Sequence, residues 1–249
     1  MKIDFLTINN LRLRYAFLNN HTDSNLLILP GWGGTLEAWQ NFLNGFDCAD
    51  FNVYFLELPG FGKSDPPLEA WQLADYASCI KAAIIKFDLK NLSLFGHSFG
   101  GQIAACLAAN EPQLLRKLFL SGPAIIREPK KSFKLPRFVK VLVNLPFLKP
   151  LKKIFYYFFA SRDYAAIKNP IMKETFQNII TTDGRVSFKN IAIPVIMFWG
   201  TNDTYTPLKQ GLLLKELLPS AELKIFEESG HGLHLQQPQE LQNLIKEKI

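Results

Sequence analysis

A serine, an aspartate and a histidine occur in this sequence where nucleophilic chemistry needs them. Residues 96–100 read G-H-S-F-G, of the form G-x-S-x-G, between an apolar run and a small-residue run. A serine on so sharp a turn needs small neighbours, because the turn crowds the backbone. Such a turn lifts the Ser98 hydroxyl clear of the sheet and aims the next helix N-terminus at developing negative charge. We predict that Ser98 is a nucleophile.

The partners of this serine come from two later loops. A serine hydroxyl is a weak nucleophile unless a base takes its proton and an acid orients that base. Asp203 follows an apolar run within FWGTNDTYTP, and His231 follows the next one within FEESGHGLHLQQP. We choose His231 over His234 because it stands at the exit of the expected strand, directly after Gly230. The predicted catalytic residues are Ser98, Asp203 and His231.

Acyl transfer also needs hydrogen-bond donors for an oxyanion. The backbone N–H of Phe99, which follows the nucleophile, and that of Trp32 in PGWGG are the candidates. His97 is expected to pack beneath the serine turn. The residues that we assign to a substrate pocket are His97, Phe155, Phe158, Tyr205 and His234.

Alternating strands and helices must position these groups. That alternation is typical of a mostly parallel sheet covered by helices on both faces, so the fold class is α/β. We expect strands within 2–8, 11–18, 25–29, 51–58, 91–95, 114–122, 193–200 and 221–228, and helices within 35–43, 71–87, 102–110, 208–218 and after 238.

The alternation breaks in the middle of the chain. Six prolines and several short amphipathic runs lie between Gly122 and about Asp183, which indicates a helical insertion. The chain has 249 residues, enough for one large core and too few for two full-sized enzymatic domains. We predict a core domain formed by 1–121 and 186–249, and a cap formed by 122–185.

Positive charge is concentrated in that insertion. Residues 121–185 hold 13 Lys or Arg and 4 Asp or Glu, while the whole chain has a net charge of +6. Three interpretations stay open: a lid with solvated lysines, a surface for an acidic carrier protein or anionic substrate, or a helix resting on anionic lipid. No recognisable nucleic-acid module accompanies the charge, so nucleic acid is not expected as a partner. This basic segment contains no run of 18 residues without a charged side chain, so we do not expect it to span a membrane.

Cofactor chemistry has no signal in the sequence. No phosphate-binding glycine loop occurs, and no His, Cys or Asp residues have the spacing of a metal site, so we expect neither cofactor nor metal. The three cysteines show no C-x-x-C spacing, and the first 15 residues lack the apolar core of a secretory signal. We expect a cytoplasmic protein, with peripheral membrane association as the alternative that the basic segment leaves open.

Five segments together resemble the α/β-hydrolase fold superfamily: LLILPGWGG, LELPGFGKSD, LFGHSFGG, WGTNDTYTP and SGHGLHLQQP. The resemblance implies an eight-stranded, mostly parallel sheet with a cap inserted after the sixth strand. Within the family, these motifs are similar to those of pimeloyl-acyl-carrier-protein methyl ester esterases. They are more loosely similar to those of hydrolases that cleave carbon–carbon bonds in ring-fission products.

Three positions depart from the family pattern. Pro30-Gly31 replaces the usual His-Gly before the oxyanion residue, and proline lacks a backbone donor, so the support of that loop must differ. Gln236 stands where Glu is common, and Glu57 stands where Asp is usual.

The function expected from these residues is cleavage of a carboxylic ester with an apolar acyl or aryl group, by a serine carboxylesterase. Hydrolysis of a carbon–carbon bond or a thioester, and acyl transfer, use the same residues and stay open. A non-catalytic protein that binds lipid or a partner through its basic cap is the alternative from another class.

Overall fold

The computed structural model describes residues 1–46, 50–127, 164 and 166–249. Cys48, Phe155, Phe158 and most of the basic residues of the expected cap lie outside these ranges. The strands are β1 (Lys2–Ile8), β2 (Leu11–Leu18), β3 (Asn25–Leu29), β4 (Asn52–Leu56), β5 (Leu92–His97), β6 (Lys117–Ser121), β7 (Val195–Gly200) and β8 (Glu222–Phe226). The helices are α1 (Leu36–Asn44), α2 (Leu73–Lys86), α3 (Phe99–Asn110), α7 (Pro170–Thr181), α8 (Arg185–Phe188), α9 (Leu208–Leu217), α10 (Leu233–Gln236) and α11 (Pro238–Lys248).

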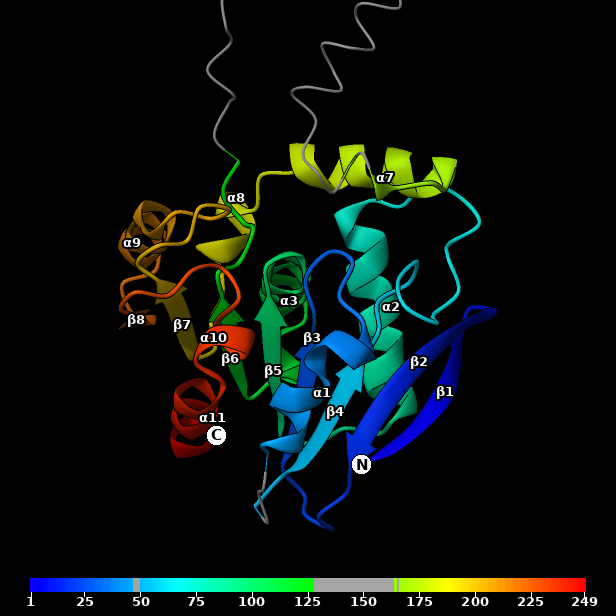
Figure 1. The fold of residues 1–249 in the computed structure, drawn as a ribbon, viewed down its shortest axis with the longest axis horizontal. Coiled ribbons are helices and arrows are strands. Elements are labelled where there is room, and N and C mark those ends of the chain that lie inside the picture. Colours follow the sequence, from blue (N-terminus) through cyan, green and yellow to red (C-terminus); the bar gives the residue numbers. More distant parts are fainter. Residues whose placement is uncertain (47–49, 128–163, 165) are drawn as a thin grey trace, which may run out of the picture.

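The described strands form one eight-stranded sheet in the order β1-β2-β4-β3-β5-β6-β7-β8 (Figure 1). β1 pairs with β2 and β2 with β4 in antiparallel fashion, and every other pairing is parallel. This architecture confirms the predicted fold. Because β3 to β8 run in the same direction, the loops that follow them open at one edge of the sheet.

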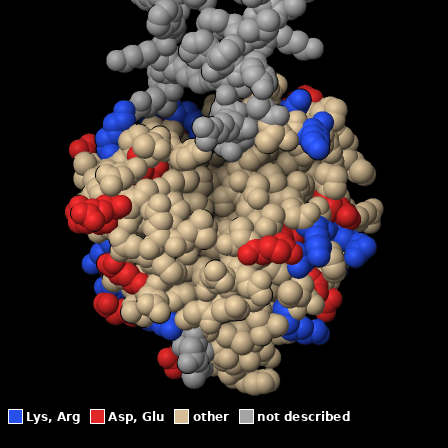
Figure 2. Space-filling view, viewed as in Figure 1, with Lys and Arg blue, Asp and Glu red and all other residues tan. Residues whose placement is uncertain are grey.

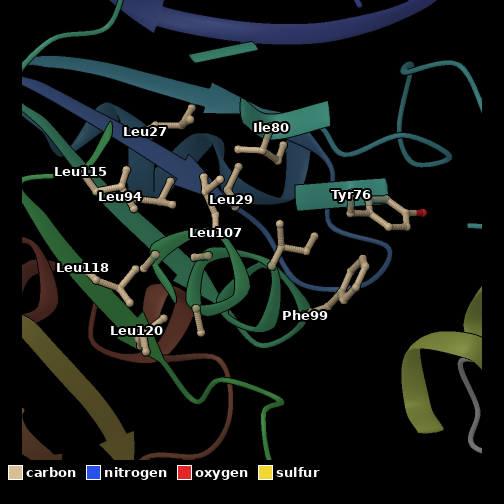
Figure 3. Packing of buried hydrophobic residues seen from close by; sticks show 14 of the residues in the cluster. Leu27, Leu29, Tyr76, Ile80, Leu94, Phe99, Leu107, Leu115, Leu118 and Leu120 are labelled. Carbon is tan, nitrogen blue, oxygen red and sulfur yellow. The ribbon is translucent and has the colours of Figure 1, made fainter. Parts of the chain in front are cut away.

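Two apolar layers cover the sheet, and alternation along each strand divides the residues between them. Leu27 and Leu29 of β3 face the layer formed with α2, α3, α8 and α9, part of which Figure 3 shows. Leu26 and Ile28 face the layer formed with α1, α10 and α11. Since both faces are covered, the central strands are mostly apolar, and the polar Ser93 and His97 of β5 are themselves buried.

The part of the expected cap that the structure describes centres on α7, which lies across the upper end of the molecule in Figure 1. Thr175 Oγ1 accepts a hydrogen bond from the Trp71 backbone N–H at 3.0 Å, and Asn178 donates to the Trp71 carbonyl at 3.3 Å. These bonds tie α7 to the loop before α2. The division into a core and a cap at 122 and 185 stays a prediction.

Within the described ranges, no helix has both the length and the apolar composition required to cross a lipid bilayer.

Candidate active site

Ser98 occupies a strained turn between β5 and α3. Its backbone has φ 53° and ψ −113°, a conformation that non-glycine residues rarely adopt. The flanking glycines are required by close approach of the backbone. A Cβ on Gly96 would lie 2.5 Å from the Gly100 carbonyl oxygen, and one on Gly100 would collide with the carbonyls of Leu29 and Pro30. Close packing of the backbone therefore explains why Gly96 and Gly100, which flank the Ser98 turn, are small, as the sequence predicts.

Asp203 and His231 meet at the same edge of the sheet. Asp203 follows β7 and His231 follows β8, and Asp203 Oδ2 lies 2.7 Å from His231 Nδ1. The Asp203 side chain is 1% exposed and that of His231 is 17% exposed. This geometry holds the Nδ1–H of His231 against a carboxylate and leaves Nε2 as the free nitrogen.

Hydrogen bonds from one short turn fix the Asp203 carboxylate. Oδ1 accepts from the backbone N–H groups of Tyr205 and Thr206, each at 2.9 Å, and Oδ2 accepts from Thr206 Oγ1 at 2.8 Å. Burial raises the pKa of Asp203, but the hydrogen bonds from His231 and Thr206 outweigh it, so the pKa lies below its usual value. Asp203 is therefore ionised at neutral pH.

Gly122 gives these groups the room in which to meet. Its φ is +48°, and a Cβ there would lie 3.1 Å from each of Asp203 Oδ2, His231 Nδ1 and Thr206 Oγ1. A side chain at this position would press on all three atoms. The aspartate–histidine pair therefore requires a glycine at the first position after β6.

The same segment links the pair to Ser98, whose backbone N–H donates to the Ser121 carbonyl at 2.9 Å. Ser98 is in this way beside Gly122, where a Cβ would lie 3.1 Å from His231 Nδ1. Among the described residues no hydrogen bond joins the Ser98 hydroxyl to His231, a contact that often tightens only when substrate binds. The structure therefore brings all three predicted catalytic residues to one sheet edge, while their roles stay predictions.

The loop after β3 borders Ser98 on its other side. A Cβ on Gly31 would lie 3.2 Å from Ser98 Cβ, so the backbone of this loop passes directly beside the serine. The half-buried ring of Trp32 contacts Phe61 at 4.8 Å, Phe176 at 4.9 Å and Phe99 at 5.3 Å between ring centroids. An aromatic cluster thus adjoins the two backbone N–H groups predicted to bind an oxyanion.

His97 lies beneath the turn, as the sequence predicts. Its Nδ1 is 3.0 Å from the Ser121 carbonyl, which only accepts, so Nδ1 carries the proton and the ring is held as one tautomer. Burial, together with the nearby His231 and His234, keeps the pKa of His97 well below its usual value. His97 is a neutral, packed side chain.

His234, which we assign from the sequence to a substrate pocket, is a buried residue, and its role in a pocket stays a prediction. It is 7% exposed and stacks on Trp39 in the core, with ring centroids 3.8 Å apart and an interplanar angle of 4°. Burial and the neighbouring His231 lower its pKa to about 4, and its Nδ1 has no hydrogen-bond partner among the described residues. The histidine three residues after His231 fits into the apolar layer because a neutral imidazole is flat and stacks like an aromatic ring.

The remaining predicted pocket residues divide in two. Tyr205 is 65% exposed and its ring stacks on His231 at 5.2 Å, which places it at the rim of the site. Phe155 and Phe158 lie outside the described residues.

Figure 2 shows that most charged side chains on the viewed face, which includes α1, α10 and α11, lie toward its margin.

Sequence reasoning missed four residues of this site: Thr206, Gly122, Phe61 and Phe176. The segment D-T-Y-T carries the one local signal, since an aspartate often accepts N–H groups two and three residues later. The other three depend on contacts between distant segments. In the part of the chain that the structure describes, no group of three or more His, Cys, Asp or Glu residues is placed to hold a metal ion.

Curated proteins similar to this chain share about a quarter of its residues. One is a 2-hydroxy-6-oxononadienedioate/2-hydroxy-6-oxononatrienedioate hydrolase of Cupriavidus pinatubonensis, 24% identical over 91% of this chain and 88% of that protein. The hydrolase of the same name from Escherichia coli O139:H28 is 26% identical over 84% of this chain and 81% of its own length.

Solved structures show the same architecture. A membrane phospholipase A, described as a bacterial virulence factor, superposes with a TM-score of 0.78 at 22% identity, covering 99% of this chain and 84% of that one. An esterase from Exiguobacterium antarcticum superposes with a TM-score of 0.77 at 19% identity, covering 98% of each chain. The family model of the alpha/beta hydrolase fold matches residues 25–147 and 159–238. With this match over most of its length, the chain belongs to the α/β-hydrolase fold family.

Proposed function

We propose that this protein is a serine hydrolase that cleaves carboxylic esters carrying an apolar acyl or aryl group. The observation that carries the proposal is the 2.7 Å contact between Asp203 and His231 at the edge where Ser98 occupies its strained turn. A buried, ionised aspartate on Nδ1 of a histidine is the arrangement that prepares Nε2 to accept a serine proton.

The proposed reaction begins with attack of Ser98 Oγ on the ester carbonyl, while His231 Nε2 takes the hydroxyl proton. The negative charge that develops on the carbonyl oxygen is stabilised by the backbone N–H groups of Phe99 and Trp32. Asp203 stabilises the imidazolium of His231 and itself remains deprotonated. Collapse of the intermediate releases the alcohol, which takes its proton from His231, and leaves an acyl group on Ser98.

Water completes the cycle. His231 accepts a proton from the water that attacks the acyl-enzyme, and a second tetrahedral intermediate uses the same two N–H donors. Its collapse releases the carboxylic acid and returns the proton to Ser98. Each proton taken in one step is thereby returned in another, and no cofactor is required.

The surroundings of Trp32 support an apolar substrate group. Phe61, Phe99 and Phe176 surround this ring, and they come from three different segments of the chain. Aromatic side chains offer apolar contact area and little hydrogen bonding to a sugar or a phosphate. An acyl or aryl group beside the predicted oxyanion donors therefore fits these residues better than a charged one.

Hydrolysis of a carbon–carbon bond is the second candidate, and the names of the curated relatives favour it. Those proteins are named for doubly carboxylated substrates. The two candidates share the same nucleophile and base, so a substrate panel separates them. An apolar cluster of Trp32, Phe61 and Phe176 beside the site favours the neutral ester.

The test is a panel of p-nitrophenyl esters of increasing acyl length, assayed beside a ring-fission dienedioate. We expect turnover of the esters and at least a thousandfold loss of kcat in Ser98→Ala, because the other groups cannot replace the nucleophile. Ser78→Ala is the matched control, since Ser78 is exposed on α2. Turnover of the dienedioate alone would favour the second candidate, and full ester activity in Ser98→Ala would refute the proposal.

A further inference from the structure

A buried carboxylate joins two loops at the candidate site. Glu57 follows β4, and its side chain has 0% of its surface exposed. Its Oε1 accepts the backbone N–H of Leu36, the first residue of α1, at 2.7 Å. Its Oε2 accepts the backbone N–H of Lys63 at 2.8 Å. One side chain therefore fixes the backbone of both loops.

These two loops also meet through their aromatic residues. Trp32 lies four residues before Leu36, and Phe61 lies two residues before Lys63. Their rings pack edge to face with centroids 4.8 Å apart. The loops are thus joined twice, once by the Glu57 carboxylate and once by the ring contact. Because so few residues separate Trp32 from Leu36, the position of one restricts the position of the other.

The second loop is shaped around the carboxylate. Gly62 has φ +56°, and a Cβ there would overlap the Glu57 carboxylate. A non-glycine residue at this position would need both an unfavourable backbone conformation and displacement of the carboxylate. The loop from Pro59 to Ser64 is therefore closed tightly over Glu57.

The charge of Glu57 is offset by an arginine. Arg14 Nη1 lies 3.4 Å from Glu57 Oε1 and 2.6 Å from Glu37 Oε1. The Arg14 side chain is 8% exposed, whereas that of Glu37 is 57% exposed. The cost of burying a carboxylate is offset when it accepts hydrogen bonds from N–H groups and lies near a cation, and Glu57 does both.

We propose that Glu57 is a positioning residue for catalysis: by holding Leu36 and Lys63, it sets the orientation of the Trp32 N–H toward the oxyanion. Glu57 does not touch the substrate, and it acts through the loop that borders Ser98. The inference rests on the proposed function, because an oriented donor accelerates only a reaction in which an oxyanion develops. It also gives the loop after β3 the support that the Pro30-Gly31 sequence requires.

The first test compares Glu57→Gln with Glu37→Gln. Both variants replace a carboxylate of Arg14 with an amide, but only the first disturbs the two loop N–H groups. For p-nitrophenyl butyrate we expect Glu57→Gln to lower kcat at least tenfold with KM changed less than twofold. Glu37→Gln should change neither value more than twofold. A residue that only stabilises the fold would lower the melting temperature and leave kcat of the folded enzyme unchanged.

A second variant removes the donor in place of the acceptor. Leu36→Pro deletes the N–H that Glu57 accepts, and proline is tolerated at the first position of a helix. Thr35 already has φ −119° and ψ 159°, an extended conformation that suits a residue before proline. We expect a smaller loss of kcat than in Glu57→Gln, because the bond between Glu57 and the Lys63 N–H remains. Since the Leu36 side chain is buried, kcat is compared on protein shown to be folded. Adding Leu36→Pro to Glu57→Gln should lower kcat less than threefold further, because Glu57→Gln already disturbs the bond to the Leu36 N–H.

The rate at which a fluorophosphonate labels Ser98 separates this inference from the proposed function. Labelling also needs the oxyanion donors, and it requires no ester turnover. If the wild type labels at Ser98 but cleaves no ester, the proposed function fails, and labelling slowed at least tenfold by Glu57→Gln still supports the inference. Unchanged labelling and kcat in folded Glu57→Gln and Leu36→Pro would overturn it. A wild type that neither labels nor cleaves overturns both.

Discussion

Replacing Thr206 with valine changes almost no volume and removes a hydroxyl that hydrogen-bonds the buried Asp203 carboxylate and also lies 3.2 Å from the Gly122 carbonyl oxygen and 3.3 Å from His231 Nδ1. Thr206 Oγ1 lies 2.8 Å from Asp203 Oδ2, and the Asp203 side chain is 1% exposed, so water cannot easily replace the hydroxyl. A hydrogen bond to a charged group contributes about 1.5–3 kcal/mol to stability. A loss of about 2 kcal/mol lowers the melting temperature of a protein of this size by about 4–8 °C. We expect Thr206→Val to fall in that range.

Activity should fall as well, because Thr206 helps to hold the carboxylate that orients His231. Asp203 keeps its two backbone N–H donors in the variant, so a partial loss is expected. Displacement of a catalytic group by about 1 Å can cost about a hundredfold in rate. A smaller shift predicts a decrease in kcat of about tenfold, measured by ester hydrolysis at pH 7.

The lowered pKa of Asp203 also predicts how the effect of Thr206→Val on stability changes with pH. The pKa of Asp203 is lowered in the folded state, so its stabilisation is present above its unfolded pKa and is lost as pH falls through the folded one. The stability difference between Thr206→Val and the wild type should therefore be constant from about pH 5 to 7 and shrink below about pH 4. Urea denaturation over this range measures it.

Thr206→Ser is the control, because serine retains the hydroxyl and loses only a methyl group. We expect it to keep kcat within about threefold of the wild type. Equal stability and activity of the serine and valine variants would refute the reasoning, since only the hydroxyl distinguishes their contacts with Asp203.

Further predictions concern positions around the same site. Gly122→Ala should lower stability by about 1–2 kcal/mol, because the residue has a positive φ. It should also lower kcat by about tenfold or more, because the added Cβ crowds Asp203 and His231. A fully active, stable variant contradicts this prediction. The stability of His234→Phe relative to the wild type should rise by up to about 3 kcal/mol as pH falls from 6.5 to about 4, because His234 binds its proton only in the unfolded chain over that range. Denaturation midpoints at pH 7 and 5 measure this difference in stability, and an equal difference at both pH values disproves the prediction. If the basic segment 121–185 binds anionic lipid, the full chain should sediment with anionic vesicles at low salt and be released at high salt; a chain left in the supernatant at low salt excludes that alternative.

Local patterns in the sequence predicted the alternation of strands and helices, and the resemblance to the α/β-hydrolase superfamily supplied the eight-stranded sheet. The runs expected to form strands lie near the observed strands, the central ones because strands covered on both faces are mostly apolar. The turn at Ser98 was predictable for the same local reason, since its glycines answer steric demands within a few residues. Asp203 and His231 were found because both follow strands of one parallel sheet.

Contacts between distant segments were beyond this reasoning. Trp32 meets Phe176 across 144 positions, and Glu57 meets the N–H of Leu36 across 21, without any local periodicity to indicate either. The stacking of the His234 ring on Trp39, with centroids 3.8 Å apart, was likewise not indicated by any local pattern. Packing geometry decided these cases, and a single sequence does not contain it explicitly.

The nucleophile is tested most directly by mapping a fluorophosphonate adduct by mass spectrometry on the intact wild-type chain. We predict one adduct, on Ser98, and labelling slowed at least a hundredfold in His231→Ala, because the hydroxyl then lacks its base. No adduct on Ser98, or equal labelling with and without the imidazole of His231, would contradict the account.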